Sequence, residues 1–146
     1  MKINLIKSEK KDLPILAEIY KTEFSKSPYN ENWNVKKAKD KMKFFSENYD
    51  VYTIKTNDKI AGFVVINPRF MCPGEVAFGE EMAIKEEYKR KGAGTYALNK
   101  ILDIYRKKGF KIYMGIVNKH SNSLGLHKKI NAKESKSDIV VVKKLK

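Results

Sequence analysis

The chain has 146 residues, of which 42% are hydrophobic and 33% are charged. This composition is typical of one soluble globular domain and argues against disorder. No apolar run is long enough to span a membrane, and the first residues lack the apolar core of a secretory signal. We therefore expect a single cytoplasmic domain over residues 1–146. The lone cysteine, Cys72, excludes an internal disulfide and any zinc site built from several cysteines.

Positive charge is concentrated in the second half of the chain. The formal net charge is +14. Residues 85–146 hold 17 Lys/Arg and 5 Asp/Glu, whereas residues 51–84 hold 3 and 4. A basic half of this kind can hold a polyphosphate cofactor, attract nucleic acid, or only keep the protein soluble. Charge alone does not decide among these three.

The first part of the chain predicts a strand followed by two helices. Apolar and polar residues alternate over residues 2–7, as in a half-buried strand. Asp12 can cap a helix that runs to about Phe24, with a proline in its first turn. Asn34 can cap a second helix over residues 35–45.

The remaining elements alternate between strands and helices. Strands are expected over 51–55, 60–66, 75–84 and 110–117. One expected helix follows Gly92 and Gly94 and runs to about residue 107, and another occupies 121–129. Residues 132–145 are expected to form a closing hairpin. The order β-α-α-β-β-β-α-β-α-β-β predicts an α/β fold. Its central mixed, twisted sheet should have about six or seven strands, with helices on both faces.

The stretch from Lys89 to Thr95 lies between a predicted strand and a predicted helix. Gly92 and Gly94 let the backbone approach a ligand closely, because neither carries a Cβ. A helix N-terminus presents unpaired N–H groups and the positive end of the helix dipole. Three consecutive cations, 89–91, add charge. The stretch therefore predicts a pyrophosphate site.

Two well-known nucleotide motifs do not explain this site. Residues 92–97 formally match the dinucleotide fingerprint G-x-G-x-x-G/A. That fingerprint needs an acidic residue near the end of the next strand, where this chain has Asn118 and Lys119. A P-loop is excluded because no Gly-Lys-Ser/Thr follows a four-residue spacer.

Two other motifs occur together at the separation found in one family. Residues 84–94 follow the pattern Arg/Gln-x-x-Gly-x-Gly/Ala after a strand, with Lys89 in place of Arg or Gln. Further on, His120 stands where the family has Asn, His127 where it has Tyr or His, and Asn131-Ala132 where it has Gly-Phe. Over nearly its whole length the chain resembles the GNAT superfamily of acyl-CoA-dependent N-acetyltransferases, which implies a GNAT-like fold.

The resemblance implies acetyl-CoA (coenzyme A) as co-substrate and no metal. It assigns to CoA binding the strand-end residues Met82, Ala83 and Ile84, the cations Lys89, Arg90 and Lys91, the turn residues Gly92, Ala93, Gly94 and Thr95, and His120 or Asn122 beside the pantetheine. A strand-end N–H would lie near the thioester oxygen, where negative charge develops as the amine attacks.

The resemblance also implies catalytic residues. Glu81 occupies the position where similar enzymes carry an acid, and we predict it as general base or as the anion that binds the amine. Glu80 is the alternative, since side chains alternate along a strand and only one of the two should face the acceptor. His127 is the candidate acid, because an imidazolium can protonate a departing thiolate. Glu81 can instead pair with a nearby lysine or recognise the charge of the substrate without moving a proton. His127 can instead be a helix-surface residue that only hydrogen-bonds. Packing roles are assigned to Tyr88, Tyr96 and Tyr113.

The acceptor candidates are Tyr29, Glu31 and Trp33, in the loop between the first two helices. In similar enzymes this loop lines the acceptor groove, and a Trp beside an acid can receive a cationic amine. Trp33 can equally pack the corner between the helices.

Taken together, the resemblance implies an N-acetyltransferase acting on a primary amine of a small molecule or peptide by direct attack in a ternary complex. We expect a monomer or homodimer and no membrane partner. Two alternatives stay open: a basic nucleic-acid-associated module, and a CoA-binding regulator without turnover. The positive charge argues modestly against a polycationic acceptor, unless the acidic strand 75–81 supplies local negative charge.

Overall fold

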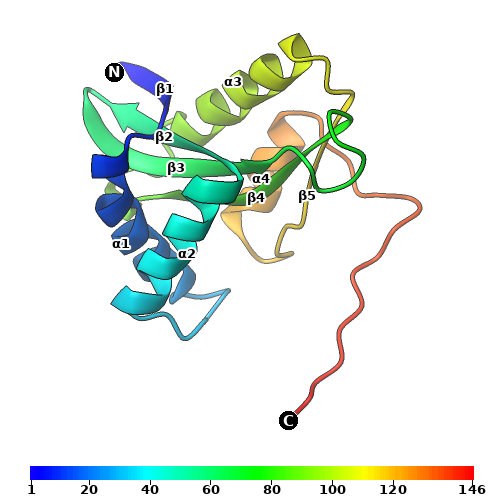
Figure 1. The fold of residues 1–146 in the computed structure, drawn as a ribbon, viewed down its shortest axis with the longest axis horizontal. Helices are drawn as coiled ribbons and strands as arrows, with labels where there is room; N and C mark the ends of the chain where they lie inside the picture. Colours follow the sequence, from blue (N-terminus) through cyan, green and yellow to red (C-terminus); the bar gives the residue numbers. More distant parts are fainter.

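All 146 residues are described by a computed structural model. Figure 1 shows the elements β1 (Ile3–Lys7), α1 (Leu13–Phe24), α2 (Val35–Asn48), β2 (Asp50–Thr56), β3 (Lys59–Asn67), β4 (Val76–Ile84), α3 (Ala93–Lys107), β5 (Ile112–Gly115) and α4 (Asn122–Lys129). Two single-turn 3-10 helices, η1 (Lys10–Asp12) and η2 (Glu86–Tyr88), precede α1 and α3. None of the helices is long and apolar enough to cross a bilayer.

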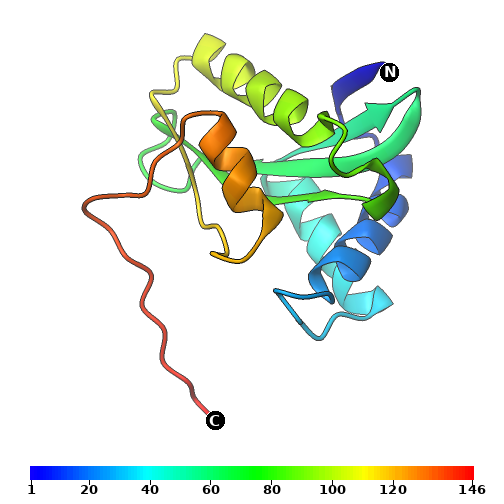
Figure 2. The same ribbon diagram turned by 180° about the vertical axis from the view of Figure 1, so that it is seen from behind.

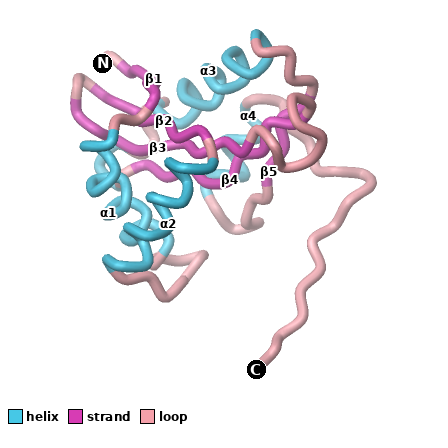
Figure 3. Tube along the Cα trace, in the orientation of Figure 1, coloured by secondary structure: helices cyan, strands magenta, loops and turns pink.

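The strands form one sheet in the order β1-β2-β3-β4-β5. Neighbours from β1 to β4 are antiparallel, and β5 runs parallel to β4. Figure 3 shows the strands as one layer between the helices. The predicted mixed sheet with helices on both faces is confirmed, but it has five strands and not six or seven.

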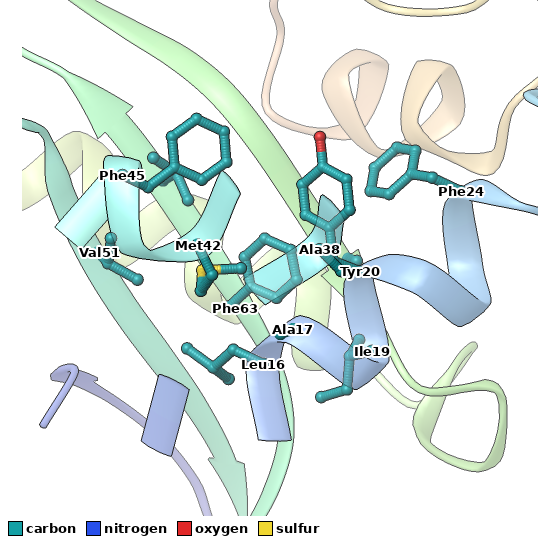
Figure 4. Packing of buried hydrophobic residues seen from close by; sticks show 12 residues of the cluster. Leu16, Ala17, Ile19, Tyr20, Phe24, Ala38, Met42, Phe45, Val51 and Phe63 are labelled. Atoms are coloured by element: carbon teal, nitrogen blue, oxygen red, sulfur yellow. The ribbon is translucent and has the colours of Figure 1, made fainter. Parts of the chain in front are cut away.

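Each face of the sheet is covered by its own helices and has its own core. The helices α1 and α2 pack on one face around large side chains that include Leu16, Tyr20, Met42, Phe45 and Phe63 (Figure 4). On the opposite face α3 contributes its apolar stripe of Ala93, Ala97, Ile101 and Tyr105, and α4 lies beside it (Figure 2). The sheet is therefore buried on both faces in its centre.

The predicted helix caps differ in outcome. The Asn34 side chain accepts a hydrogen bond from the Lys37 backbone N–H at 2.8 Å, as predicted, and α2 continues one turn further than expected, to Asn48. Asp12 precedes α1 but makes no side-chain bond to it. Its carboxylate instead accepts from the Glu9 N–H at 3.0 Å, which closes the preceding single turn η1.

The predicted closing hairpin over 132–145 is wrong. These residues form no strand, and the segment runs away from the body of the protein (Figures 1 and 2). The apolar residues Ile139 and Val142 are each 87% exposed. A β-branched run favours an extended backbone, but a strand also needs a partner and a surface to bury, and the polar residues before it contain no hairpin turn signal. The predicted strand 110–117 is likewise reduced to the four residues of β5.

Candidate active site

The parallel strands β4 and β5, at the edge of the sheet, are paired only along the first half of β4. They pair from Val76 with Ile112 to Gly79 with Gly115, where β5 ends. Beyond Gly79, β4 continues to Ile84 and hydrogen-bonds only to β3. One edge of this segment, 80–84, therefore presents free backbone N–H and C=O groups. We call this position, at Gly79 and Gly115, the fork. Met82, Ala83 and Ile84, the residues that the resemblance assigns to the pantetheine arm, lie on this free segment.

The free segment of β4 leads through η2 to the N-terminus of α3. Gly92 precedes this helix with a φ of +87°, a left-handed conformation that glycine adopts without strain. No side chain caps the helix. The first backbone bond of the helix joins the Tyr96 N–H to the Gly92 carbonyl. The amides of Ala93, Gly94 and Thr95 therefore have no intrahelical partner and are available to an anion.

The second glycine of the turn serves packing. A Cβ at Gly94 would lie 3.1 Å from Leu126 Cδ2 and 3.2 Å from Met82 Cε. No atom lies within 4 Å of a Cβ built at Gly92. Gly94 thus lets the start of α3 approach β4 and α4 closely, whereas Gly92 supplies the backbone conformation of the turn.

The three cations before the turn differ in their ion pairs. Lys89 Nζ lies 2.5 Å from Glu23 Oε1 and 2.9 Å from Glu86 Oε2. Burial opposes its charge, but hydrogen bonds to these carboxylates outweigh burial and raise the pKa of Lys89. Arg90 also pairs with Glu86, at 3.2 Å. Hydrogen bonds from Lys89 and Arg90 lower the pKa of Glu86 to about 2. Lys91 makes no ion pair and is the cation that remains free.

A bulge in β4 places two carboxylates on the same side. The β3–β4 register shifts by one residue between Val65 and Ile66, which makes Glu80 the extra residue. Glu80 and Glu81 both raise the pKa of Tyr20 through their charge. Glu81 accepts from Tyr20 on the face covered by α1 and α2, and Glu80 accepts from Asn67, which lies on the side of β3 that faces the same helices. The expectation that alternation lets only one of them face this side is wrong, because the bulge interrupts the alternation.

Glu81 is held by Tyr20, which belongs to the core between the sheet and α1 and α2. The Tyr20 hydroxyl donates a hydrogen bond to Glu81 Oε2. Burial is the largest cause that raises the pKa of Glu81 to about 7, and the bond from Tyr20 opposes it. Burial and the negative charges nearby raise the pKa of Tyr20 as well. A carboxyl group with a pKa near 7 is suited to accept a proton at neutral pH.

The loop between α1 and α2 reaches the same place. Trp33 lies edge-on to Tyr20, with ring centroids 4.5 Å apart. Its indole Nε1 donates to Glu31 Oε1 at 3.0 Å, and Glu31 is close enough to raise the pKa of Glu81. Tyr29 packs against Phe24 instead, with centroids 4.7 Å apart. The structure therefore places Trp33 between Tyr20 and Glu31, and Trp33 also packs on the core between the two helices.

His127 lies on α4, on the opposite face of the sheet. Its Nδ1 is 2.7 Å from the Ser123 carbonyl oxygen, and its Nε2 is 3.0 Å from the Tyr113 hydroxyl. Burial raises the pKa of Tyr113 to about 12. His120 and Asn122 are exposed, at the turn that opens α4. The His120 backbone N–H donates to Asn118, and neither of the two side chains hydrogen-bonds to Tyr113 or His127.

Sequence reasoning missed the polar contacts of four residues. They are Tyr20, Tyr113, Asn67, which donates to Glu80 at 3.0 Å, and Ser123, whose carbonyl binds His127. A tyrosine within an apolar helix stripe is a usable signal, because its buried hydroxyl needs a partner. No comparable signal marks Asn67, because its partner Glu80 lies on another strand. None marks Ser123 either, because its main-chain carbonyl makes the contact with His127.

Known proteins match this chain in sequence pattern and in fold. Residues 13–131 match the profile of the Acetyltransferase (GNAT) family. No curated protein matches the sequence at a significant level. Among solved structures, a possible acetyltransferase from Clostridium difficile 630 is 16% identical, with full coverage of both chains and a TM-score of 0.80.

Two similar structures carry more specific descriptions. AAC(6')-Iy in complex with the bisubstrate analog CoA-S-monomethyl-acetylneamine is 12% identical, with 99% of each chain covered and a TM-score of 0.75. An aminoglycoside acetyltransferase from an uncultured soil metagenomic sample is 15% identical, with 99% of this chain and 97% of the other covered and a TM-score of 0.70. At these identities the structures establish the fold, whereas the profile match covers most of the chain. This protein therefore belongs to the GNAT acetyltransferase family.

Proposed function

We propose that this protein transfers the acetyl group of acetyl-CoA to a primary amine, on a small molecule or peptide, by direct attack in a ternary complex. The observation that carries the proposal is the continuity between the free edge of β4 and the uncapped start of α3. An edge with free N–H and C=O groups suits the amide-containing pantetheine arm, and an open helix N-terminus suits a pyrophosphate. The free charge of Lys91 lies at the same turn.

The reaction needs a base for the amine and a proton for the leaving sulfur. We assign the base to Glu81, whose pKa of about 7 leaves about half of it ionised and able to accept a proton at neutral pH. Glu80, the second carboxylate, accepts from Asn67 and contributes charge beside it. A free N–H on segment 80–84 would stabilise the oxygen of the attacked thioester.

The acceptor side favours a cationic amine. Glu31, Glu80 and Glu81 all act on Tyr20 through their negative charge, although the whole chain carries +14. This local negative charge removes the argument against polycationic acceptors. Because a similar structure is described as an aminoglycoside acetyltransferase, aminoglycosides belong in the acceptor screen together with diamines and peptide N-termini.

The first experiment is calorimetric titration with acetyl-CoA at low and at moderate salt. We expect saturable, micromolar binding that persists at moderate salt. Lys91→Met should weaken it, whereas Lys107→Met, at the other end of α3, is the matched control and should not. Absence of saturable binding would overturn the proposal and leave the basic half to be explained by another polyanion such as nucleic acid.

The second experiment follows thiol release from acetyl-CoA over the panel of amines. Turnover with one class of amine identifies the acceptor. Binding of acetyl-CoA without turnover on any amine would favour a CoA-binding regulator instead, in keeping with the departures at Lys89, His120 and Asn131-Ala132 from the family motifs.

A further inference from the structure

Both ring nitrogens of His127 are engaged. Nδ1 faces the Ser123 carbonyl oxygen, which can only accept, so the neutral imidazole carries its proton on Nδ1. Nε2 is then an acceptor, and the Tyr113 hydroxyl donates to it. Direct proton transfer from His127 to a leaving sulfur would require one of these bonds to break.

The Tyr113 hydroxyl, in contrast, lies at the fork itself. A Cβ built at Gly79 would stand 2.5 Å from the hydroxyl oxygen, and one built at Gly115 would stand 3.6 Å from it. These two glycines form the last β4–β5 pair. The same Gly115 Cβ would be 3.9 Å from His127 Nε2. The phenol oxygen is therefore next to the point where the free edge of β4 begins, and His127 Nε2 is hydrogen-bonded to it.

On the basis of the proposed function, we propose that Tyr113 is the residue that protonates the leaving sulfur and that His127 replaces its proton. As the carbon–sulfur bond breaks, the electron pair stays on sulfur and the Tyr113 hydroxyl proton moves to it. In the same step the Nε2 proton of the His127 imidazolium moves to the Tyr113 oxygen. The imidazole is left neutral and takes a proton from solvent before the next turnover.

The acidity of the phenol explains why two residues are needed. Burial raises the pKa of Tyr113 to about 12, which keeps the hydroxyl protonated as a donor. A thiol has a pKa of about 8.5, so this phenol alone would not give up its proton to a thiolate. Transfer becomes favourable when an imidazolium replaces the proton at once. The stacked rings, with centroids 5.7 Å apart and planes 24° apart, hold the pair in place.

The test compares the binding of CoA with that of desulfo-CoA, which lacks the sulfur, from neutral pH to about pH 9.5, across the ionisation of the thiol. If Tyr113 contacts the sulfur, CoA should gain affinity over desulfo-CoA as the thiolate forms, by roughly tenfold for a hydrogen bond to a charged group. Tyr113→Phe should abolish this gain and leave desulfo-CoA binding unchanged. Tyr49→Phe is the matched control, because it removes a phenol that packs on Phe45, in the core on the opposite face of the sheet.

A second variant separates the two residues. His127→Gln keeps the Tyr113 hydroxyl and should keep the pH-dependent gain. A gain lost in His127→Gln and retained in Tyr113→Phe would assign the sulfur contact to His127 and overturn the proposal. Imidazole ¹H–¹⁵N spectra give an independent readout, because the chain has two histidines and His120→Gln assigns them. We expect neutral His127 as the Nδ1–H tautomer; the Nε2–H tautomer would contradict the proposal.

The outcomes also distinguish this proposal from the proposed function. Equal affinity for CoA and desulfo-CoA at every pH would remove the role of Tyr113 and leave an acetyl-CoA-dependent enzyme. Failure of the protein to bind either molecule would remove the proposed function and the role of Tyr113 with it.

Discussion

Tyr20 on α1 donates a hydrogen bond to Glu81 on β4, which joins the helix layer to the free segment of the sheet. The Tyr20 ring is fixed by Phe63, on which it stacks with centroids 5.9 Å apart, and by the edge-on ring of Trp33. A rigid donor holds the carboxylate in one position, and its bond limits the rise in the pKa of Glu81 that burial causes. Position and acidity of the proposed base therefore depend on one tyrosine.

Removal of this hydroxyl should make Glu81 a weaker acid. Burial, Glu31 and Glu80 raise the pKa of Glu81, whereas Tyr20 and Lys41 lower it. In Tyr20→Phe only one of the two lowering causes remains, so the pKa should rise above about 7. The change is measured by ¹³C NMR titration of the side-chain carboxyl groups, with Glu81→Gln identifying the signal. A pKa at or below the wild-type value would refute the assignment.

Glu81 should also make the stability of the protein depend on pH. Its folded pKa of about 7 lies above the ordinary value of 4.5, so the folded chain holds this proton more tightly. The stabilisation is fully present below pH 4.5 and is lost as the pH rises through 7, by about 3 kcal/mol in all. Glu81→Gln should match the wild type in acid and exceed its free energy of unfolding above pH 7. Denaturant unfolding at both pH values measures this, and parallel pH profiles would contradict it.

The two lysines that flank Arg90 should have separable roles. Lys89→Met leaves Glu23, which is 9% exposed, without its nearest cation, although Lys26 remains 3.0 Å away. We expect a loss of roughly 1–3 kcal/mol in the free energy of unfolding. Lys91→Met removes a charge that has no partner and should change stability by less than about 0.5 kcal/mol while it weakens acetyl-CoA binding. Denaturant unfolding and calorimetric titration with acetyl-CoA measure both effects in each variant. Weaker binding in Lys89→Met and lower stability in Lys91→Met would instead place Lys89 at the phosphate.

Two helical glycines offer a matched comparison. A Cβ at Gly125 of α4 meets no atom within 4 Å, whereas at Gly94 of α3 it meets Leu126 and Met82. Gly125→Ala should stabilise the protein by about 0.5–1 kcal/mol through helix propensity. Gly94→Ala should lose this gain, because well-packed side chains have to shift to make room for the added carbon. Thermal unfolding of the two variants gives the difference, and an equal gain at both positions would show that the contact at Gly94 is easily relieved.

Much of the fold could be predicted because its signals are local. The Asn34 cap, the spacing of apolar residues in α3 and the turn at Gly92 each depend on residues close in sequence. The motif around Gly92 and Gly94 also predicted a helix start, which the structure has at Ala93. The extent of β5 was not predictable in this way, because a strand ends where its partner diverges, which is a property of the whole sheet.

The geometry around the proposed catalytic residues depends on long-range relationships. The bulge at Glu80 exists only in the pairing of β4 with β3, so the alternation rule gave the wrong answer for the two glutamates. Tyr20 and Glu81 are 61 residues apart, and Tyr113 and His127 are 14 apart. Periodicity can assign a residue such as Tyr20 to an apolar helix face, but it does not reveal what a buried hydroxyl binds.

The C-terminal segment has a consequence for how the protein behaves in concentrated solution. Ile139 and the three valines that follow are exposed on a chain that leaves the body of the protein, and short β-branched segments of this kind tend to associate with one another. Lys136 stands before the run, and Lys143 and Lys144 follow it. Charged residues in these positions oppose stacking of copies. Because salt screens such repulsion, copies of the protein should associate more readily as ionic strength rises. The same screening reduces charge repulsion within each molecule, so the fold itself should become more stable.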